Sequence, residues 1–236
     1  MSIFSHLPRR ATIAIALILL VGMLALQAGR EGLSNFYALL ANEELNHPSM
    51  TEQRFREEGG ARALHYLTES LRYSPNNAWA LEEMGVLQIR RLPLFTGPIH
   101  ALTALNTARS ANAHLHRALL ERPTSSFIWA NLARSKLSLN ERDGELLQAL
   151  RRADELGPWE PEVQKSVIYL SLMIWDRLDP DQQASVVRTM ERSAKRDAIN
   201  VTNVAKSFNR LDLVCGIKEA RSVLGNGDCN PVKNFK

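Results

Sequence analysis

Residue types able to carry chemistry are sparse in this chain, and their spacing limits what they can do. His114 and His116 are metal-ligand types, but positions i and i+2 of a helix point about 200° apart and cannot share one ion. Adjacent carboxylates diverge by about 100°, so they seldom face one substrate as acid and base. Three such pairs occur, Glu43-Glu44, Glu57-Glu58 and Glu82-Glu83. The sequence has no nucleophile elbow, phosphate loop or dinucleotide fingerprint, which predicts a protein that is not an enzyme and takes no cofactor or metal.

The two cysteines offer a different chemistry. Cys215 and Cys229 are separated by residues 216–228, whereas a CxxC redox pair or a zinc site requires other spacing and more ligands. In an oxidising compartment they would pair and close a loop of about 15 residues, worth about 3 kcal/mol in the chain-entropy model. The alternative is two unrelated thiols, one buried and one on a loose tail. We expect the disulfide.

An uncharged apolar segment lies near the N-terminus, at residues 11–28. As a helix it is about 27 Å long, close to the hydrocarbon thickness of a bilayer. A cleaved signal peptide is the alternative, because Arg9 and Arg10 resemble its basic n-region. However, the run is long for a signal peptide, and Leu26 stands where cleavage after Ala28 would favour a small residue. We therefore expect an uncleaved transmembrane helix.

The charges around this segment predict its orientation. Arg9 and Arg10 precede it, while Arg30 after it is accompanied by Glu31. The positive-inside bias then keeps the N-terminus in the cytoplasm and exports the body, which in a bacterium means the inner membrane and the periplasm. The two leading arginines also account for half of the net charge of +4. No basic block remains, so we expect no nucleic-acid partner.

The rest of the chain reads as helices separated by proline corners. Pro123 interrupts residues 117–137, which have helical spacing at both ends, and a ring without an N–H ends a helix. Thr124 or Ser125 can cap the next helix through its side-chain oxygen. Pro75 and Pro158 stand at similar corners. The composition is rich in Ala, Leu, Arg and Glu without alternating β-branched runs, so the predicted fold class is all-α.

Three further helix signals are local. Gly157, just before Pro158, is expected in the left-handed conformation that often follows a helix, and Pro161 in the first turn of the next one. Asp179 and Gln182 fit a capping box. One more short helix is expected at residues 200–210.

The helices flanking the corners are apolar on one face only, so stacked antiparallel pairs would share a core. They resemble degenerate tetratricopeptide (TPR) repeats, helix-turn-helix units of roughly 34 residues. Matching positions, over about residues 60–197, are Trp129, Leu132 and Ala133 for W-x-x-L-G, Ala153 and Pro158 for the second helix and closing proline, Leu81, Met84 and Gly85 for a second set, and Pro75 and Pro123 as further closing prolines.

The prolines are 48 and 35 residues apart, so one unit carries an insertion of about 14 residues relative to the motif. Pro93 and Pro98 within it predict an ordered loop between helices. The resemblance implies a helical-hairpin solenoid behind the transmembrane helix. It also implies that the first helices line a groove for a peptide or helix of another protein. The candidate groove contacts are Trp79, Glu82, Arg90, Phe127 and Arg134.

The segments "RPTSSFIWANLARSKL" and "LQALRRADELGPWEPEVQ" resemble the sequences of small membrane-anchored TPR-like proteins encoded in bacterial exopolysaccharide clusters. This likeness implies a non-enzymatic adaptor for exopolysaccharide biosynthesis, polymerisation or export. Its partners would be the membrane and other proteins, such as a polysaccharide polymerase or export component. One alternative is a general periplasmic TPR interaction or chaperone-type protein of envelope assembly. The other is a carbohydrate-active enzyme that uses Glu82.

The expected organisation has five parts. It comprises a cytoplasmic N-terminal tail (1–10), a transmembrane helix (11–28), a membrane-proximal helix at residues 33–46 with a linker (29–59), TPR-like helical repeats (60–211), and a C-terminal segment with the disulfide (212–236).

Overall fold

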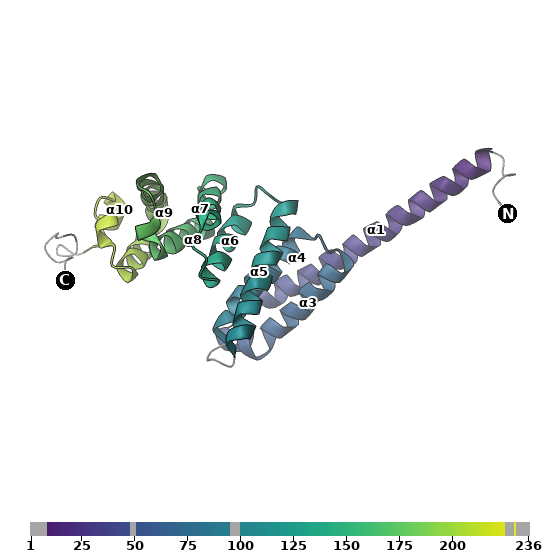
Figure 1. Ribbon diagram of the computed structural model, residues 1–236, viewed down its shortest axis with the longest axis horizontal. Coiled ribbons are helices and arrows are strands. Elements are labelled where there is room, and N and C mark those ends of the chain that lie inside the picture. The colour runs from purple at the N-terminus through teal and green to yellow at the C-terminus, as the bar shows by residue number, and fades with distance from the viewer. Residues whose placement is uncertain (1–8, 48–50, 95–99, 225–228, 230–236) are drawn as a thin grey trace. The chain divides into compact units, whose positions relative to one another are not determined.

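The computed structural model describes residues 9–47, 51–94, 100–224 and 229. All regular secondary structure in this part of the chain is helical, which confirms the all-α class (Figure 1). Expectations for residues 1–8, for Pro98 and for the tail around Cys229 lie outside the described residues. The principal helices are α1 (Arg9–Asn46), α2 (Glu52–Arg54), α3 (Gly60–Tyr73), α4 (Ala78–Arg91), α5 (Ala101–Glu121), α6 (Ser126–Ser138), α7 (Gly144–Leu156), α8 (Pro161–Met173), α9 (Pro180–Ser207) and α10 (Lys218–Arg221).

Short helical turns complete the path. A π-helical turn, η1 (Phe55–Gly59), leads into α3, and 3₁₀ turns η2 (Leu92–Leu94), η4 (Trp175–Arg177) and η5 (Leu211–Leu213) follow α4, α8 and α9. The chain divides into two compact units, residues 1–83 and 84–236, and each is considered by itself.

In the first unit, α1 is one uninterrupted helix of 38 residues. Sequence analysis expected a separate helix from Leu33, but Gly29 and Gly32 do not break α1. Packing explains this, because the second half of α1 lies along α3, and tertiary packing outweighs weak glycine propensity. Among the described residues, α1 is the helix long and apolar enough to cross a membrane, and its apolar window is not buried inside the protein.

Small side chains bring α1 and α3 together as an antiparallel pair, visible in Figure 1. Ser34, Ala38 and Ala41 recur at helical spacing on α1 and are at most 5% exposed. Ala63 and Leu67 of α3 are fully buried. Side chains of this size let two helix axes approach closely, and each apolar face covers the other.

The three proline corners share one construction. Each helix ends two residues before its proline, at Tyr73, Glu121 and Leu156, and the next begins three residues after it, at Ala78, Ser126 and Pro161. The prediction of two helices around Pro123 is therefore confirmed. Of the two candidate caps, Ser125 is the one used, since its hydroxyl accepts from the Ile128 backbone N–H at 3.4 Å. Pro161 takes the first turn of α8, as expected.

The expectation of a left-handed Gly157 is wrong. Its φ is −130°, a backbone conformation open to other residues. Glycine is needed here for space instead, because a Cβ on Gly157 would lie 2.6 Å from the Cβ of Ser126. The end of α7 thus packs against the start of α6, a contact that the local sequence does not reveal.

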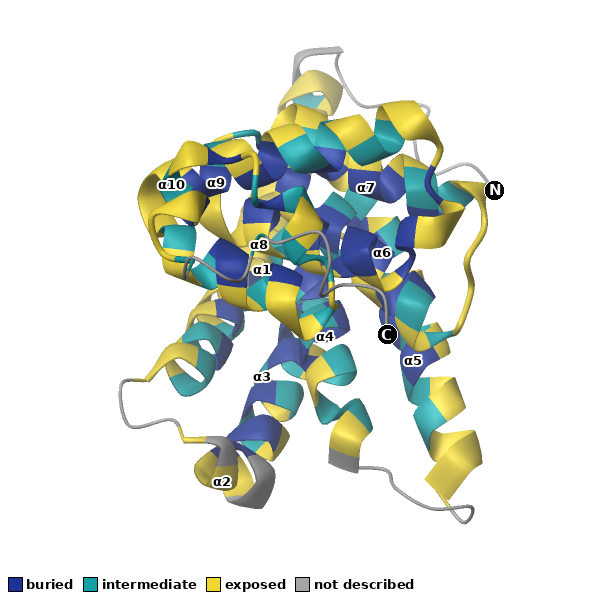
Figure 2. Cartoon of the chain, turned by 90° about the vertical axis from the view of Figure 1, so that its left-hand side faces the viewer, coloured by how far each residue is buried: buried dark blue, intermediate teal, exposed yellow. Residues whose placement is uncertain are grey.

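Motif positions of the second unit lie in its core. Leu132, Ala133 and Ala153 are at most 1% exposed, and a Cβ on Gly85 of α4 would lie only 2.7 Å from Leu115 of α5. α6 packs against α5, α7 and α8. Figure 2 shows buried residues, in dark blue, on both α6 and α7.

The end of the second unit follows its sequence signals in part. Asp179 and Gln182 form the expected capping box, with bonds of 2.8 and 3.1 Å. The short helix expected at residues 200–210 is the second half of α9, which kinks at Asp197 and ends at Ser207. The Asp197 carboxylate caps this half by accepting from the Asn200 backbone N–H at 3.0 Å.

Candidate functional site

Two side chains bind the corner prolines in the same way. The indole N–H of Trp129 donates to the Pro123 carbonyl at 2.8 Å, and the Gln164 amide donates to the Pro158 carbonyl at 2.6 Å. Each donor lies six residues after its proline, so Gln164 has in α8 the place that Trp129 has in α6. The motif pattern misses Gln164 because a different residue type makes the equivalent hydrogen bond.

The neighbouring helices α6 and α8 present a candidate protein-binding surface. The Arg134 guanidinium of α6 donates to the Ser166 hydroxyl of α8 at 3.1 Å. Phe127 is 42% exposed, Tyr169 48% and Met173 42%. These five residues are named the α6–α8 face. Exposed aromatic and aliphatic side chains beside an arginine are typical of protein interfaces.

Sequence reasoning proposed part of this face and missed the rest. Phe127 and Arg134 were proposed as groove contacts, and both are exposed. Tyr169 and Met173 were missed, although Tyr169 lies 35 residues after Arg134, the same interval that separates the corner prolines Pro123 and Pro158. Transferring the positions of one helix by this interval would have found Tyr169.

The remaining groove candidates lie on α4. Arg90 is exposed and Trp79 is half-buried, but Glu82 is 7% exposed and so offers little surface to a partner or substrate. Trp79 and Glu82 belong to the first unit and Arg90 to the second.

Burial also affects the carboxyl group next to Glu82. Removal from water, and secondarily the nearby Glu82 carboxylate, raise the pKa of Glu83 to about 7. The Glu83 side chain therefore changes its charge near neutral pH.

A cluster around a buried lysine joins α6 to α7. The Lys136 side chain is 6% exposed, and its ammonium lies 2.7 Å from Glu141, 2.8 Å from Asp143 and 2.8 Å from Glu145. The three carboxylates remain 39–52% exposed. His116 of α5 extends the cluster, with its Nε2 2.7 Å from Glu145. The cluster therefore consists of one buried cation and three anions at the surface. It was not predicted from the sequence.

The pKa values of the cluster follow from these contacts. Burial disfavours the charged form of Lys136, but the hydrogen bonds to Asp143, Glu141 and Glu145 outweigh it and raise the pKa of Lys136. The hydrogen bond from Lys136 lowers the pKa of Asp143. Hydrogen bonds from Lys136 and then His116 lower the pKa of Glu145. All three groups are charged at neutral pH, as a structural salt-bridge cluster requires.

The two neighbouring histidines have separate surroundings. His114 Nδ1 lies 2.8 Å from the Ser110 carbonyl and 3.1 Å from Gln88, and burial lowers the pKa of His114. His116 instead bonds the Asn112 carbonyl at 2.9 Å and Glu145. Within the described parts of the chain, no group of three or more His, Cys, Asp and Glu side chains could hold a metal ion.

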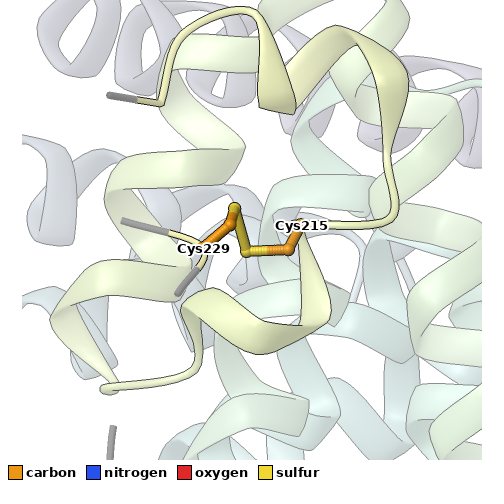
Figure 3. Close-up of a disulfide and its surroundings, with 2 residues drawn as sticks. All are labelled: Cys215 and Cys229. Atoms are coloured by element: carbon orange, nitrogen blue, oxygen red, sulfur yellow. A yellow bond between two sulfur atoms is a disulfide. The ribbon is translucent and has the colours of Figure 1, made fainter. Parts of the chain in front are cut away.

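The two cysteines lie at disulfide distance, as the sequence predicts (Figure 3). Their sulfur atoms are 2.16 Å apart and their Cα atoms 5.6 Å apart. The bond joins Cys215, which follows η5, to Cys229.

A cavity of about 380 Å³ opens among α7, α8 and α9. Its most buried acidic group is already bonded by the protein, because Asp154 accepts from Thr189 at 2.7 Å and pairs with Arg192 at 2.5 Å. These contacts hold α7 to α9.

Comparisons with known proteins leave the family open. The chain matches no model of a known protein family, and it has no significant match among curated protein sequences.

Proposed function

We propose that this chain is a single-pass membrane protein whose helical body binds other proteins and has no catalytic activity of its own. The observation that carries the proposal is the α6–α8 face, where Phe127, Arg134 and Tyr169 are exposed on two neighbouring helices that the Arg134–Ser166 hydrogen bond joins. Aromatic and arginine side chains contribute a large share of binding energy at protein interfaces.

The proposal includes a TPR-like solenoid. At all three corners the helix ends lie at the same distances from the proline, which supports this fold. The equivalent hydrogen bonds of Trp129 and Gln164 support it as well. Further support is that α6 packs against both its own second helix, α7, and the next first helix, α8. In TPR-type stacking each first helix has these two neighbours, and first helices form the binding surface.

The proposed location is the bacterial inner membrane, with the body in the periplasm. The length and apolarity of α1 support a membrane span. Arg9 and Arg10 before the span support a cytoplasmic N-terminus, and a disulfide suits an oxidising compartment. Protease treatment of spheroplasts tests the orientation, since degradation of the body is expected and full resistance would reverse the topology.

We further propose that the partners are proteins of exopolysaccharide polymerisation or export. This step is supported by the resemblance of the corner segments around Pro123 and Pro158 to proteins of exopolysaccharide clusters. A general periplasmic interaction or chaperone-type role is the alternative. The two roles differ in which proteins the α6–α8 face contacts.

Site-specific crosslinking in the bacterial host tests this proposal. A photo-reactive p-benzoylphenylalanine at position 127 is expected to capture polysaccharide-assembly proteins, whereas the same group at Leu120, 81% exposed on α5, is not. Arg134→Glu should reduce the crosslinks several-fold. Arg151→Glu, a matched charge reversal at a side chain 65% exposed on α7, should not.

Three outcomes would contradict parts of the proposal. Capture of many unrelated exported proteins would favour the chaperone-type role. Unchanged polymer secretion after gene deletion would exclude the exopolysaccharide role. Glycan cleavage by the purified full-length protein would exclude the non-catalytic role.

A further inference from the structure

The packing of α1 against α3 determines which residues of the first unit lie beside each position of α1. The Ser34 and Ser70 hydroxyls are 3.0 Å apart, with Ser70 three residues before the end of α3. At the end nearer the apolar run, Arg30 Nε donates to the Tyr73 carbonyl at 3.3 Å. The corner between α3 and α4 is therefore held beside residues 30–35 of α1.

A second hydrogen-bond group secures this corner. The Asn77 amide donates to Ser34 at 2.9 Å and to Asn35 at 3.0 Å, while its oxygen accepts from the Ala80 backbone N–H at 3.2 Å. Asn77 thus caps α4 and connects it to α1. The corner cannot leave α1 without losing the hydrogen bonds to Ser34 and Asn35.

Helix geometry sets the distance of the corner from the apolar run. The uncharged run ends at Ala28, and α1 rises about 1.5 Å per residue. Arg30 therefore lies about 3 Å beyond the run, and Asn35 about 10 Å beyond it. The headgroup layer on each side of a bilayer is about 5–8 Å thick. If α1 crosses the membrane, the corner lies in or directly on the headgroups.

A cavity opens at this level. It has a volume of about 270 Å³ and is lined by Gln27, Arg30 and Glu31 of α1 and by residues 73–76 of the corner. It is named the junction cavity. Gln27 belongs to the last turn of the apolar run, so the cavity reaches from the end of the hydrophobic segment to the first charged residues.

The two charged groups of the junction cavity, Glu31 and Arg30, differ in their hydrogen bonds within the protein. Glu31 accepts from the Ser74 hydroxyl at 2.9 Å. Among the described residues, Arg30 is hydrogen-bonded through Nε alone, which leaves both Nη groups available for a ligand. The nearby Arg72 is differently placed, since it already pairs with Glu69 at 2.7 Å. The cavity therefore offers one guanidinium with two free nitrogen donors.

Aromatic and apolar side chains of α1 lie within about two turns of Arg30. Tyr73 stacks on Tyr37, with ring centroids 5.7 Å apart. Leu33 and Phe36 of α1 are 45% and 54% exposed although they lie beyond the apolar run. Tyrosine side chains are enriched where a membrane protein meets the headgroup layer.

We propose that the junction cavity binds the phosphate of a phospholipid headgroup, with Arg30 as its principal ligand. Guanidinium groups bind phosphate through two parallel hydrogen bonds, and both Nη groups of Arg30 are available for them. The occupant is a lipid because the cavity adjoins the apolar run, where acyl chains would lie along α1. The inference rests on α1 crossing the membrane, as in the proposed function, and not on the adaptor role.

Lipid retention by the purified full-length protein tests the proposal. Native mass spectrometry from detergent, with phosphatidylethanolamine and phosphatidylglycerol added, should show bound lipid that falls at least about fivefold in Arg30→Gln. Arg151→Gln, a matched change on α7, should retain lipid like the wild type. Excess inorganic phosphate should not displace the lipid. Equal retention by both variants, or displacement by phosphate, would overturn the proposal.

Measuring how deeply the α3–α4 corner lies in the bilayer gives a second test that does not involve a change at Arg30. Because the native cysteines are paired, a cysteine introduced at Asn76 or Glu43 can be labelled alone with a fluorophore. In vesicles of the same lipids, shallow brominated lipid should quench the label at position 76 and not that at position 43, about 22 Å beyond the apolar run. Equal quenching at the two positions would refute the proposed level.

Failure of the anchor can be told apart from failure of the cavity. Extraction of the protein from membranes by alkaline carbonate would disprove the membrane span itself. Retention in the membrane with unchanged lipid binding in Arg30→Gln would disprove the junction cavity alone.

Discussion

The Lys136 cluster predicts that removing the buried cation costs less stability than removing its anions. The ammonium is buried between α6 and α7, whereas Glu141, Asp143 and Glu145 remain about half-exposed. A charge left buried without a partner is strongly unfavourable, but an exposed carboxylate regains water. Removing the anions should therefore destabilise the protein more than removing the cation of the same salt bridges.

Lys136→Met removes the buried charge and keeps an unbranched side chain of similar length. The three carboxylates lose their counter-ion but can be hydrated, and the methionine no longer requires the removal of an ammonium from water. We expect a loss of about 1 kcal/mol or less, as for other buried ion pairs replaced by apolar residues. In a chain of this size that is a fall in Tm of about 2–4 °C.

Neutralising the anions leaves the ammonium buried. In the variant Glu141→Gln, Asp143→Asn and Glu145→Gln, the amide oxygens still accept hydrogen bonds, and the asparagine side chain introduced at position 143 can still cap α7 as Asp143 does. We therefore expect a loss of about 2–3 kcal/mol rather than the full 3–5 kcal/mol for an unpaired buried charge. Adding Lys136→Met to this triple variant should recover most of the loss.

Thermal and urea unfolding of the full-length protein in detergent, followed by circular dichroism at 222 nm, measures these differences. Lys165→Met is the matched control, because the Lys165–Glu162 pair is exposed on both sides and should contribute about 0.3 kcal/mol. Equal losses of stability in Lys136→Met and in the triple variant, or simple additivity of the combined changes, would contradict this prediction.

The cluster also gives a pH dependence with a defined sign. Because the folded-state pKa values of Asp143 and Glu145 are lowered, their contribution is complete above the unfolded values of about 4 and is lost as pH falls through the folded values. The triple variant should lack this acid-dependent loss of stability. An unchanged acid profile in the triple variant would assign the loss to other groups.

Further predictions concern single positions. Gly85→Ala should destabilise the protein by about 1–3 kcal/mol, because its Cβ would overlap α5, whereas Gly144→Ala, with open space around it, should be neutral or stabilising in the same unfolding assay. The raised folded pKa of Glu83 makes its carboxyl more favourable at low pH, and this contribution is lost between about pH 4 and 7. Glu83→Gln should therefore raise Tm at pH 8 and leave it unchanged at pH 4; a decrease at pH 8 would contradict the burial argument. Cys229→Ser should lower the stability by up to about 3 kcal/mol and abolish the effect of reductant on Tm.

The helical class and its corners could be predicted because their signals are local. A proline removes its N–H wherever it stands, and Asp179 with Gln182 defines a helix start within four residues. The cysteine pair was predictable from the small number of cysteines and the expected compartment. None of these features depends on a distant contact.

Features that depend on tertiary contacts could not be predicted in the same way. Gly157 is required by the neighbouring Ser126, and α1 continues past Gly32 because α3 packs against it. The Lys136 cluster did leave a signal in the sequence. A lysine on an otherwise buried helix face is followed within nine residues by Glu141, Asp143 and Glu145. A charged lysine can be buried at this position only if these carboxylates fold back and pair with it.

The continuity of α1 determines how the first unit would lie at a membrane that α1 crosses. A linker of flexible residues after Ala28 would let that unit move freely and would leave no fixed surface at the lipid headgroups. In the continuous helix, the residues that follow the apolar run also form the packing surface for α3, through Ser34 and Ala38. If α1 crosses the membrane, its insertion also fixes the level of the α3–α4 corner. In the proposed membrane protein, Arg30 and the junction cavity would be where membrane insertion and folding of the first unit depend on the same residues.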